Sequence, residues 1–215
     1  MDLPRSRLIL KDEFHGNKQW VSLIRQQSKG LPLVFIDSYQ LASKYWFYSG
    51  IPALSMNSPY ARRNSFNFWP LEDSLMGRQV YVVGPKRNPF LDEKIDLPGW
   101  EAKRGKKIDH YFSFSRVRID GGKEVLSPAG YLPLFQQPGF EKIMIDAFVF
   151  KEDTLVAIFP TGLLLKDFRQ TRTPFGSTIL PSSLPRGAYQ LRYSIGSCIP
   201  GTPTVNSAGV PLNIE

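Results

Sequence analysis

The chain is short of cysteine and histidine and has no long apolar run, and each shortage excludes a class of site. Cys198 is the only cysteine, so no disulfide can form within the chain and a cysteine-ligated zinc site is excluded. His15 and His110 have no patterned carboxylate or thiol beside them, which leaves a metal site or a Ser-His-Asp triad without support. No stretch approaches the roughly 20 apolar residues that span a bilayer. Any membrane anchor or export signal is therefore expected on sequence outside these residues.

Short catalytic motifs are missing as well. Neither Gly-rich phosphate-binding pattern occurs, and Gly-x-Ser-x-Gly is absent. Asp12-Glu13 and Asp92-Glu93 are adjacent carboxylates on polar segments, where such pairs are usually solvated. The sequence therefore predicts no catalytic residue, no cofactor and no metal ligand.

The net charge of +8 makes nucleic acid or an anionic membrane surface worth considering as a partner. That charge is divided evenly between residues 1–84 and the remainder, so no strongly basic domain stands out and no nucleic-acid partner is predicted. The densest run, Lys103 to Lys107, is flanked by Glu101 and Asp109. It is interpreted as a solvated loop or, alternatively, as a phosphate-facing patch.

Residues 1–84 alternate helical and strand patterns. Amphipathic spacing predicts helices over 16–28 and 39–49, and short apolar runs predict strands at 33–36, 53–55 and 79–83. Strands separated by helices favour parallel pairing. We therefore expect a small, mostly parallel, three-layer α/β domain.

After residue 84 the residue pattern changes twice. Residues 85–107 are rich in proline, glycine and charge, which predicts a linker or a long ordered loop. Residues 108–215 contain strand-length runs at 111–119, 142–150, 155–159 and 189–195, separated by turn residues. This pattern predicts an antiparallel β-sandwich domain.

Asp37 is a candidate binding residue because it follows the first predicted strand. Open α/β sheets commonly bind ligands beyond the C-terminal ends of their strands. The alternative is that Asp37 or Ser38 caps the next helix. The two roles do not exclude each other.

The loop from 60 to 69 is the most unusual segment, because it mixes guanidinium donors, amides and aromatic faces. Such a mixture suits sugars and phosphates, although aromatic rings filling a core beside exposed arginines would give the same composition. The candidate substrate-binding residues, including one at the start of the second helix, are Asp37, Tyr39, Tyr60, Arg62, Arg63, Asn64, Asn67 and Trp69. If the sheet is parallel, this loop and Asp37 are expected to share one pocket.

An ordered series of short motifs carries a family resemblance over about residues 12–84. The series consists of Asp37-Ser38-Tyr39-Gln40-Leu41-Ala42-Ser43, Phe47-Tyr48, Pro52, Arg62-Arg63-Asn64-Ser65-Phe66-Asn67-Phe68-Trp69, Gly77 and Val80-Tyr81-Val82. It resembles the soluble tail of bacterial polyprenyl-phosphate-dependent membrane glycosyltransferases, which are related to dolichyl-phosphate-mannose protein mannosyltransferases and aminoarabinose transferases.

This resemblance implies an accessory C-terminal domain on the extracytoplasmic, periplasmic face of the bacterial inner membrane. The full-length enzyme would transfer a sugar from a polyprenyl-phosphate carrier to an acceptor, with its catalytic residues in an N-terminal membrane part. The domain would help to position acceptor or carrier, and its partners would be a polyprenyl-phosphate sugar or glycan acceptor and the membrane. Two alternatives remain open: an independent carbohydrate-binding protein, and a small stand-alone enzyme that uses Asp37.

Overall fold

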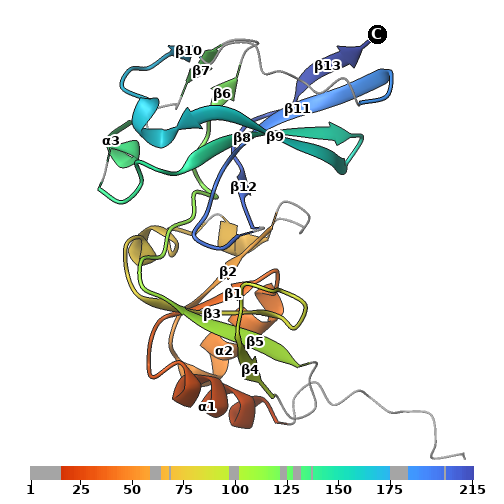
Figure 1. The fold of residues 1–215 in the computed structure, drawn as a ribbon. Helices are drawn as coiled ribbons and strands as arrows, with labels where there is room; N and C mark the ends of the chain where they lie inside the picture. Colours follow the sequence, from red (N-terminus) through yellow and green to blue (C-terminus); the bar gives the residue numbers. More distant parts are fainter. Residues whose placement is uncertain are drawn as a thin grey trace, which may run out of the picture. The chain divides into compact units, whose positions relative to one another are not determined.

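The computed structural model describes residues 16–58, 64–67, 69–96, 102–121, 125–127, 132–136, 138–174, 184–200 and 202–215 (Figure 1). The chain divides into two compact units. The first unit is Met1–Ser55 with Arg78–Asp109, and the second unit is Met56–Gly77 with His110–Glu215. A mixed α/β part followed by a β-rich part is thereby confirmed. None of the helices in the described part of the chain is long and apolar enough to cross a membrane.

The first unit is built on a five-stranded sheet with the order β2-β1-β3-β5-β4. Its strands are β1 (Leu33–Ile36), β2 (Ala53–Met56), β3 (Val80–Pro85), β4 (Glu93–Ile95) and β5 (Lys103–Ile108). β1 and β3 are parallel, whereas β5 is antiparallel to both β3 and β4. The expected mostly parallel sheet is therefore corrected to a mixed one.

Helices α1 (Asn17–Gln27) and α2 (Tyr39–Ser49) pack on one face of this sheet. The ring of Phe35 in β1 meets Trp20 of α1 edge to face at 6.5 Å and Tyr45 of α2 at 6.2 Å between ring centroids. One side chain cannot face both sides of a sheet, because successive side chains alternate between its faces. The two helices thus form a single layer, so the described residues of this unit make two layers rather than the three expected from the sequence.

Residues 85–107 differ from the expected linker or long loop, because they supply β4 and most of β5 to the first sheet. The strand β5 lacks alternating apolar residues. Two of its charged side chains pair with acids instead: Lys106 lies 2.9 Å from Asp92, and Lys107 lies 2.9 Å from Asp109. The first sheet therefore extends beyond residue 84, where the sequence placed the end of the domain.

The second unit contains two antiparallel sheets. One has the order β10-β7-β6, and the other has the order β12-β11-β8-β9 with β13 also paired to β11. The strands are β6 (Asp120–Gly121), β7 (Val125–Ser127), β8 (Met144–Lys151), β9 (Thr154–Leu164), β10 (Thr173–Pro174), β11 (Gly187–Ile195), β12 (Thr204–Val205) and β13 (Val210–Ile214). The short helices of this unit are η1 (Ser65–Asn67), η2 (Asp73–Leu75), α3 (Leu132–Phe135) and η3 (Leu165–Asp167).

The predicted strand over 111–119 is wrong, and buried Asn206 provides the physical reason. The side-chain amide of Asn206 donates to the backbone carbonyls of Phe114 at 2.6 Å and Val117 at 3.0 Å. The backbone carbonyl of Asn206 accepts from the Ile119 N–H at 2.8 Å. These backbone groups are thus satisfied without a neighbouring strand. The apolar residues of the segment pack into the core of the second unit.

Candidate functional site

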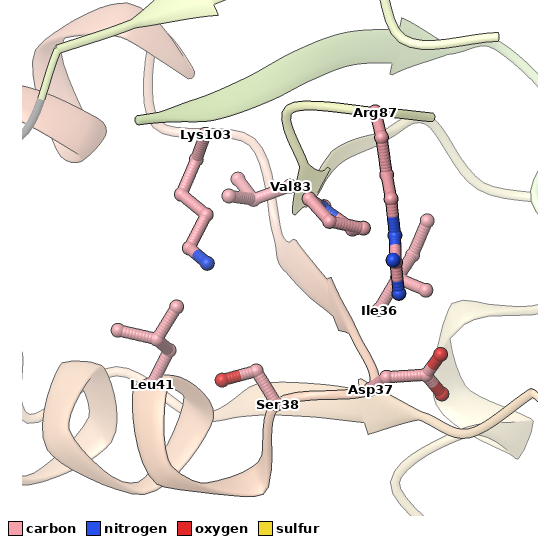
Figure 2. Close-up of a pocket in the computed structure, with 9 residues that line it drawn as sticks. Ile36, Asp37, Ser38, Leu41, Val83, Arg87 and Lys103 are labelled. Carbon is pink, nitrogen blue, oxygen red and sulfur yellow. The ribbon is translucent and has the colours of Figure 1, made fainter. Parts of the chain in front are cut away.

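A pocket of about 240 Å³ opens at the C-terminal ends of β1 and β3 in the first unit (Figure 2). This location agrees with the sequence-based expectation for Asp37. We call it the strand-end pocket. Its lining consists of Ile36, Asp37, Ser38, Leu41, Val83, Gly84, Pro85, Arg87 and Lys103.

The backbone turns sharply where β1 enters the pocket. Asp37 adopts the left-handed conformation with φ of 53°, which is uncommon for a residue with a side chain. Ser38 follows as the N-cap residue of α2, but its hydroxyl makes no side-chain capping hydrogen bond. Ser38 therefore does not cap α2 through its side chain, and its hydroxyl lines the pocket instead.

The polar groups of the pocket gather at two ends. Figure 2 shows the Lys103 ammonium and the Ser38 hydroxyl on the side of Leu41. The Asp37 carboxylate and the Arg87 guanidinium are both on the opposite side in this view. One end therefore offers N–H and O–H donors, and the other combines a carboxylate acceptor with guanidinium donors.

Apolar groups separate these two ends. Ile36, Leu41 and Val83 are almost fully buried and give the pocket an apolar surface. Gly84 lies close beside them, because a Cβ atom there would be 2.7 Å from Leu91 Cδ1 and 3.1 Å from Ile36 Cδ1, so a larger residue would need these side chains to move. The lining contains two cationic side chains, Arg87 and Lys103, and one carboxylate, Asp37. This arrangement can hold a polar ligand that carries both hydroxyl groups and an anionic group.

Arg87 and Lys103 were not among the residues proposed from the sequence. Lys103 reaches the pocket because β5 pairs with β3, placing Lys103 opposite Pro85. The only signal for it in the sequence was the basic run considered as a phosphate-facing patch. Nothing in the sequence pointed to Arg87. Tyr39 follows Ser38 and is half exposed, but it is not part of the lining.

The described residues of the loop from 60 to 69 belong to the second unit and are not part of the pocket lining. The side chain of Asn64 has local partners there. Its Nδ2 donates to Asn57 Oδ1 at 3.2 Å, and its Oδ1 accepts from the Phe66 N–H at 3.0 Å. Trp69 is 43% exposed and contacts the buried ring of Phe66. Asn67 ends η1. Tyr60, Arg62 and Arg63 lie outside the described residues.

Glu72 is a buried acid in the second unit, only 3% exposed. Burial raises the pKa of its carboxyl above 4.5, and the hydroxyl of Ser115, which donates to Glu72 Oε2 at 2.5 Å, partly offsets this effect. The neighbouring Asp73 pairs with Arg116. These contacts attach η2 to residues 115–116 of the same unit.

We expect Glu72→Gln to change how the stability of the protein depends on pH. Because the pKa of Glu72 is raised in the folded state, its stabilising contribution is complete below pH 4.5 and is lost as pH rises through the folded pKa. The Gln variant should gain stability relative to the native protein as pH rises from acidic to neutral, because glutamine does not ionise. Urea unfolding at several pH values measures this. A stability difference that stays constant with pH would contradict it.

No group of three or more histidine, cysteine, aspartate or glutamate residues that could hold a metal ion occurs in the described part of the chain. Comparison with known proteins gave no similarity: no family model, no curated protein and no solved structure matches the chain. The residues of the strand-end pocket and the motif series in the sequence are therefore the features of this chain that point to a function.

Proposed function

We propose that this chain is an accessory extracytoplasmic domain of a membrane glycosyltransferase that uses a polyprenyl-phosphate sugar. In this proposal the strand-end pocket positions the head group of the carrier or an anionic acceptor. The transfer reaction itself belongs to a membrane part outside these residues. The periplasmic location and the membrane partner are parts of the same proposal.

The observation that carries the proposal is the placement of Asp37 and Ser38. They begin the motif series that resembles the glycosyltransferase tails, and both line the strand-end pocket together with Lys103 and Arg87. Residues from three stretches of chain thus converge on one cavity. Its chemistry suits a glycosyl phosphate, which combines an anion with hydroxyl groups.

The two ends of the pocket suggest how such a ligand lies. Lys103 and Ser38 would donate to phosphate oxygens, because an ammonium and a hydroxyl both hydrogen-bond anions well. The Asp37 carboxylate would accept hydrogen bonds from sugar hydroxyls, and Arg87 would donate to the same sugar. Placing the phosphate beside Asp37 would bring two negative charges together, which disfavours the reverse orientation.

The second unit would serve as an appended module that contacts glycan or a partner protein. We infer that its two antiparallel sheets form a β-sandwich, in keeping with the alternating pattern of strands such as β11. Ile145 and Ala147 of β8 and Tyr193 and Ile195 of β11 belong to the described core of this unit, so the five-stranded sheet has an apolar face of the kind that a sandwich buries.

We expect Lys103→Ala to weaken binding of a sugar 1-phosphate about tenfold or more, because a charge-assisted hydrogen bond contributes about 1.5 to 3 kcal/mol. Lys107→Ala is the matched control, since Lys107 lies on the same strand, is absent from the pocket lining and pairs with Asp109. Titration calorimetry measures how tightly each variant binds a sugar 1-phosphate, inorganic phosphate and the neutral sugar. Equal weakening by the two variants would remove the pocket from the proposal.

We also expect the chain by itself to show no sugar transfer from a polyprenyl-phosphate donor. The experiment incubates the chain with donor and acceptor and follows product formation. Turnover that Asp37→Asn abolishes would refute the accessory role and support a stand-alone enzyme. Binding of neutral sugars as tightly as sugar phosphates would instead favour an independent carbohydrate-binding protein.

A further inference from the structure

The outward side of the helices α1 and α2 in the first unit carries basic residues and no acid. Exposed Lys18 and Arg25 lie seven positions apart on α1, which places them on one stripe of the helix, and exposed Lys29 follows the helix. Apart from Asp37, residues 16–58 contain no aspartate or glutamate. The other acids in the described part of this unit lie within 92–109, on β4, β5 and the residues that adjoin them. The two helices therefore present positive charge to solvent.

Apolar side chains are exposed on the same two helices. Leu23 lies on α1, Tyr39 and Phe47 lie on α2, and Ile51 follows α2. Phe47 is 80% exposed, more than any other large apolar side chain in the described part of the chain. We call this surface the helix face; it consists of Lys18, Leu23, Arg25, Lys29, Tyr39, Phe47 and Ile51.

Contacts between α1 and α2 join the cations and the aromatic rings into one surface. Asn17 Nδ2, next to Lys18, donates to the Tyr48 hydroxyl at 3.5 Å, and the ring of Tyr48 meets that of Phe47 edge to face at 5.0 Å between centroids. Arg25 of α1 also lies near α2. Burial raises the pKa of the Tyr45 hydroxyl, and the Ser49 hydroxyl and the charge of Arg25 partly offset this effect.

We infer that the helix face binds an anionic membrane surface, with Lys18, Arg25 and Lys29 at the lipid phosphates and Phe47 inserted among the head groups. This inference concerns the first unit alone. It goes beyond the proposed function, which ties the chain to a membrane only through a part outside these residues. It holds whether or not the strand-end pocket binds a glycosyl phosphate.

The mixture of side chains on the helix face selects a lipid surface as its occupant. The cations complement anionic head groups, and their long stems can lie along apolar surface while the charge stays in water. The exposed apolar residues enter the boundary between head groups and acyl chains, where Tyr39 can keep its hydroxyl wet. The core of a protein interface is instead depleted of lysine. A nucleic acid would pair with the cations but offers no apolar layer for Phe47 and Ile51.

The charge part of this inference can be tested by cosedimentation of the whole chain with lipid vesicles. Vesicles of equal parts phosphatidylglycerol and phosphatidylcholine should bind the chain, vesicles of phosphatidylcholine alone should bind it much less, and salt should weaken the binding. A variant with Lys18→Glu, Arg25→Glu and Lys29→Glu should bind at least tenfold more weakly, because each cation near an anionic surface contributes about fivefold.

A matched variant controls for the overall charge. Lys142→Glu, Lys151→Glu and Arg169→Glu together change the net charge by the same amount, on exposed residues of the second unit. This variant should bind the anionic vesicles much more tightly than the helix-face variant. Circular dichroism establishes that both variants fold.

Insertion of the apolar residues is tested at Phe47. Phe47→Ser should weaken vesicle binding about tenfold, because a large apolar side chain is no longer buried. Met144→Ser is the control, since Met144 is 54% exposed but lies on β8 of the second unit. In vesicles with brominated acyl chains, Phe47→Trp should add tryptophan fluorescence that the lipid quenches, whereas Met144→Trp should add fluorescence that it does not quench.

Three results would each overturn the inference: no binding to the anionic vesicles, equal weakening by the two triple variants, and no lipid quenching in Phe47→Trp. Binding of RNA without binding of anionic vesicles would overturn it as well. Failure of the proposed function is recognised separately. None of the substituted residues lines the strand-end pocket, so the helix-face variants should keep the native affinity for a sugar 1-phosphate.

Discussion

Asn206→Asp is expected to destabilise the protein by about 3 to 5 kcal/mol, a large part of the stability of an ordinary domain. Asn206 is fully buried. Its amide nitrogen donates to the Phe114 and Val117 carbonyls, while its Oδ1 accepts from Ile195 N–H at 2.7 Å and from the Thr204 hydroxyl at 2.9 Å. Aspartate keeps the acceptor but places a second carboxylate oxygen against two carbonyl oxygens.

Urea unfolding followed by circular dichroism measures this loss. Asn213→Asp is the matched control, because the same chemical change occurs there on an exposed residue of β13 and should alter stability by less than about 0.5 kcal/mol. A protonated aspartic acid can donate one hydrogen bond, so the defect should diminish at low pH. If Asn206→Asp costs no more than the control, Asn206 does not hold residues 114–119 in place.

Gly105→Ala is expected to destabilise the protein by about 2 to 3 kcal/mol through overpacking. Gly105 lies on β5 opposite Val83, and an added Cβ would lie 2.5 Å from Cζ and 2.6 Å from Cε1 of Tyr81. The Tyr81 ring is buried and its hydroxyl donates to Glu93 Oε2 at 2.7 Å. The ring would have to leave this position and lose both its packing and its hydrogen bond.

A double-mutant cycle identifies the cause. In a Tyr81→Ala background the added methyl group has room, so Gly105→Ala should then cost less than about 1 kcal/mol. Thermal or urea unfolding of the four proteins supplies the cycle. Equal costs in both backgrounds would show that backbone restriction at Gly105, rather than the Tyr81 ring, controls the effect.

Local patterns in the sequence predicted the elements whose apolar residues recur with the period of the element. The run Leu33–Ile36 is β1, and the helix expected over 39–49 is α2. The strand β5 was missed because lysine side chains paired with acids replace apolar residues there. The segment 111–119 was misassigned because its carbonyls bind Asn206, which is about 90 residues away in sequence.

In the strand-end pocket, too, the residues placed by local structure were predictable and those placed by long-range pairing were not. Asp37 could be proposed from the sequence because its position depends only on the strand before it and the helix after it. Lys103 could not be proposed, because the pairing of β3 with β5 brings it to the pocket and no local pattern in the sequence predicts that pairing. Long-range pairing of polar strands is therefore the information that the sequence pattern lacked.

The interleaving of the two units limits where the chain can be divided. A fragment ending at residue 84 would keep most of β3 and its partner β1 but lose β5, leaving one edge of an apolar strand unpaired. A fragment ending at 109 would carry 56–77 without Ser115 and Arg116, the partners of Glu72 and Asp73. The complementary fragment from 110 onward would lack the same contacts. We therefore expect neither unit to be isolated intact by a single cut, and limited proteolysis should release no stable unit in one step.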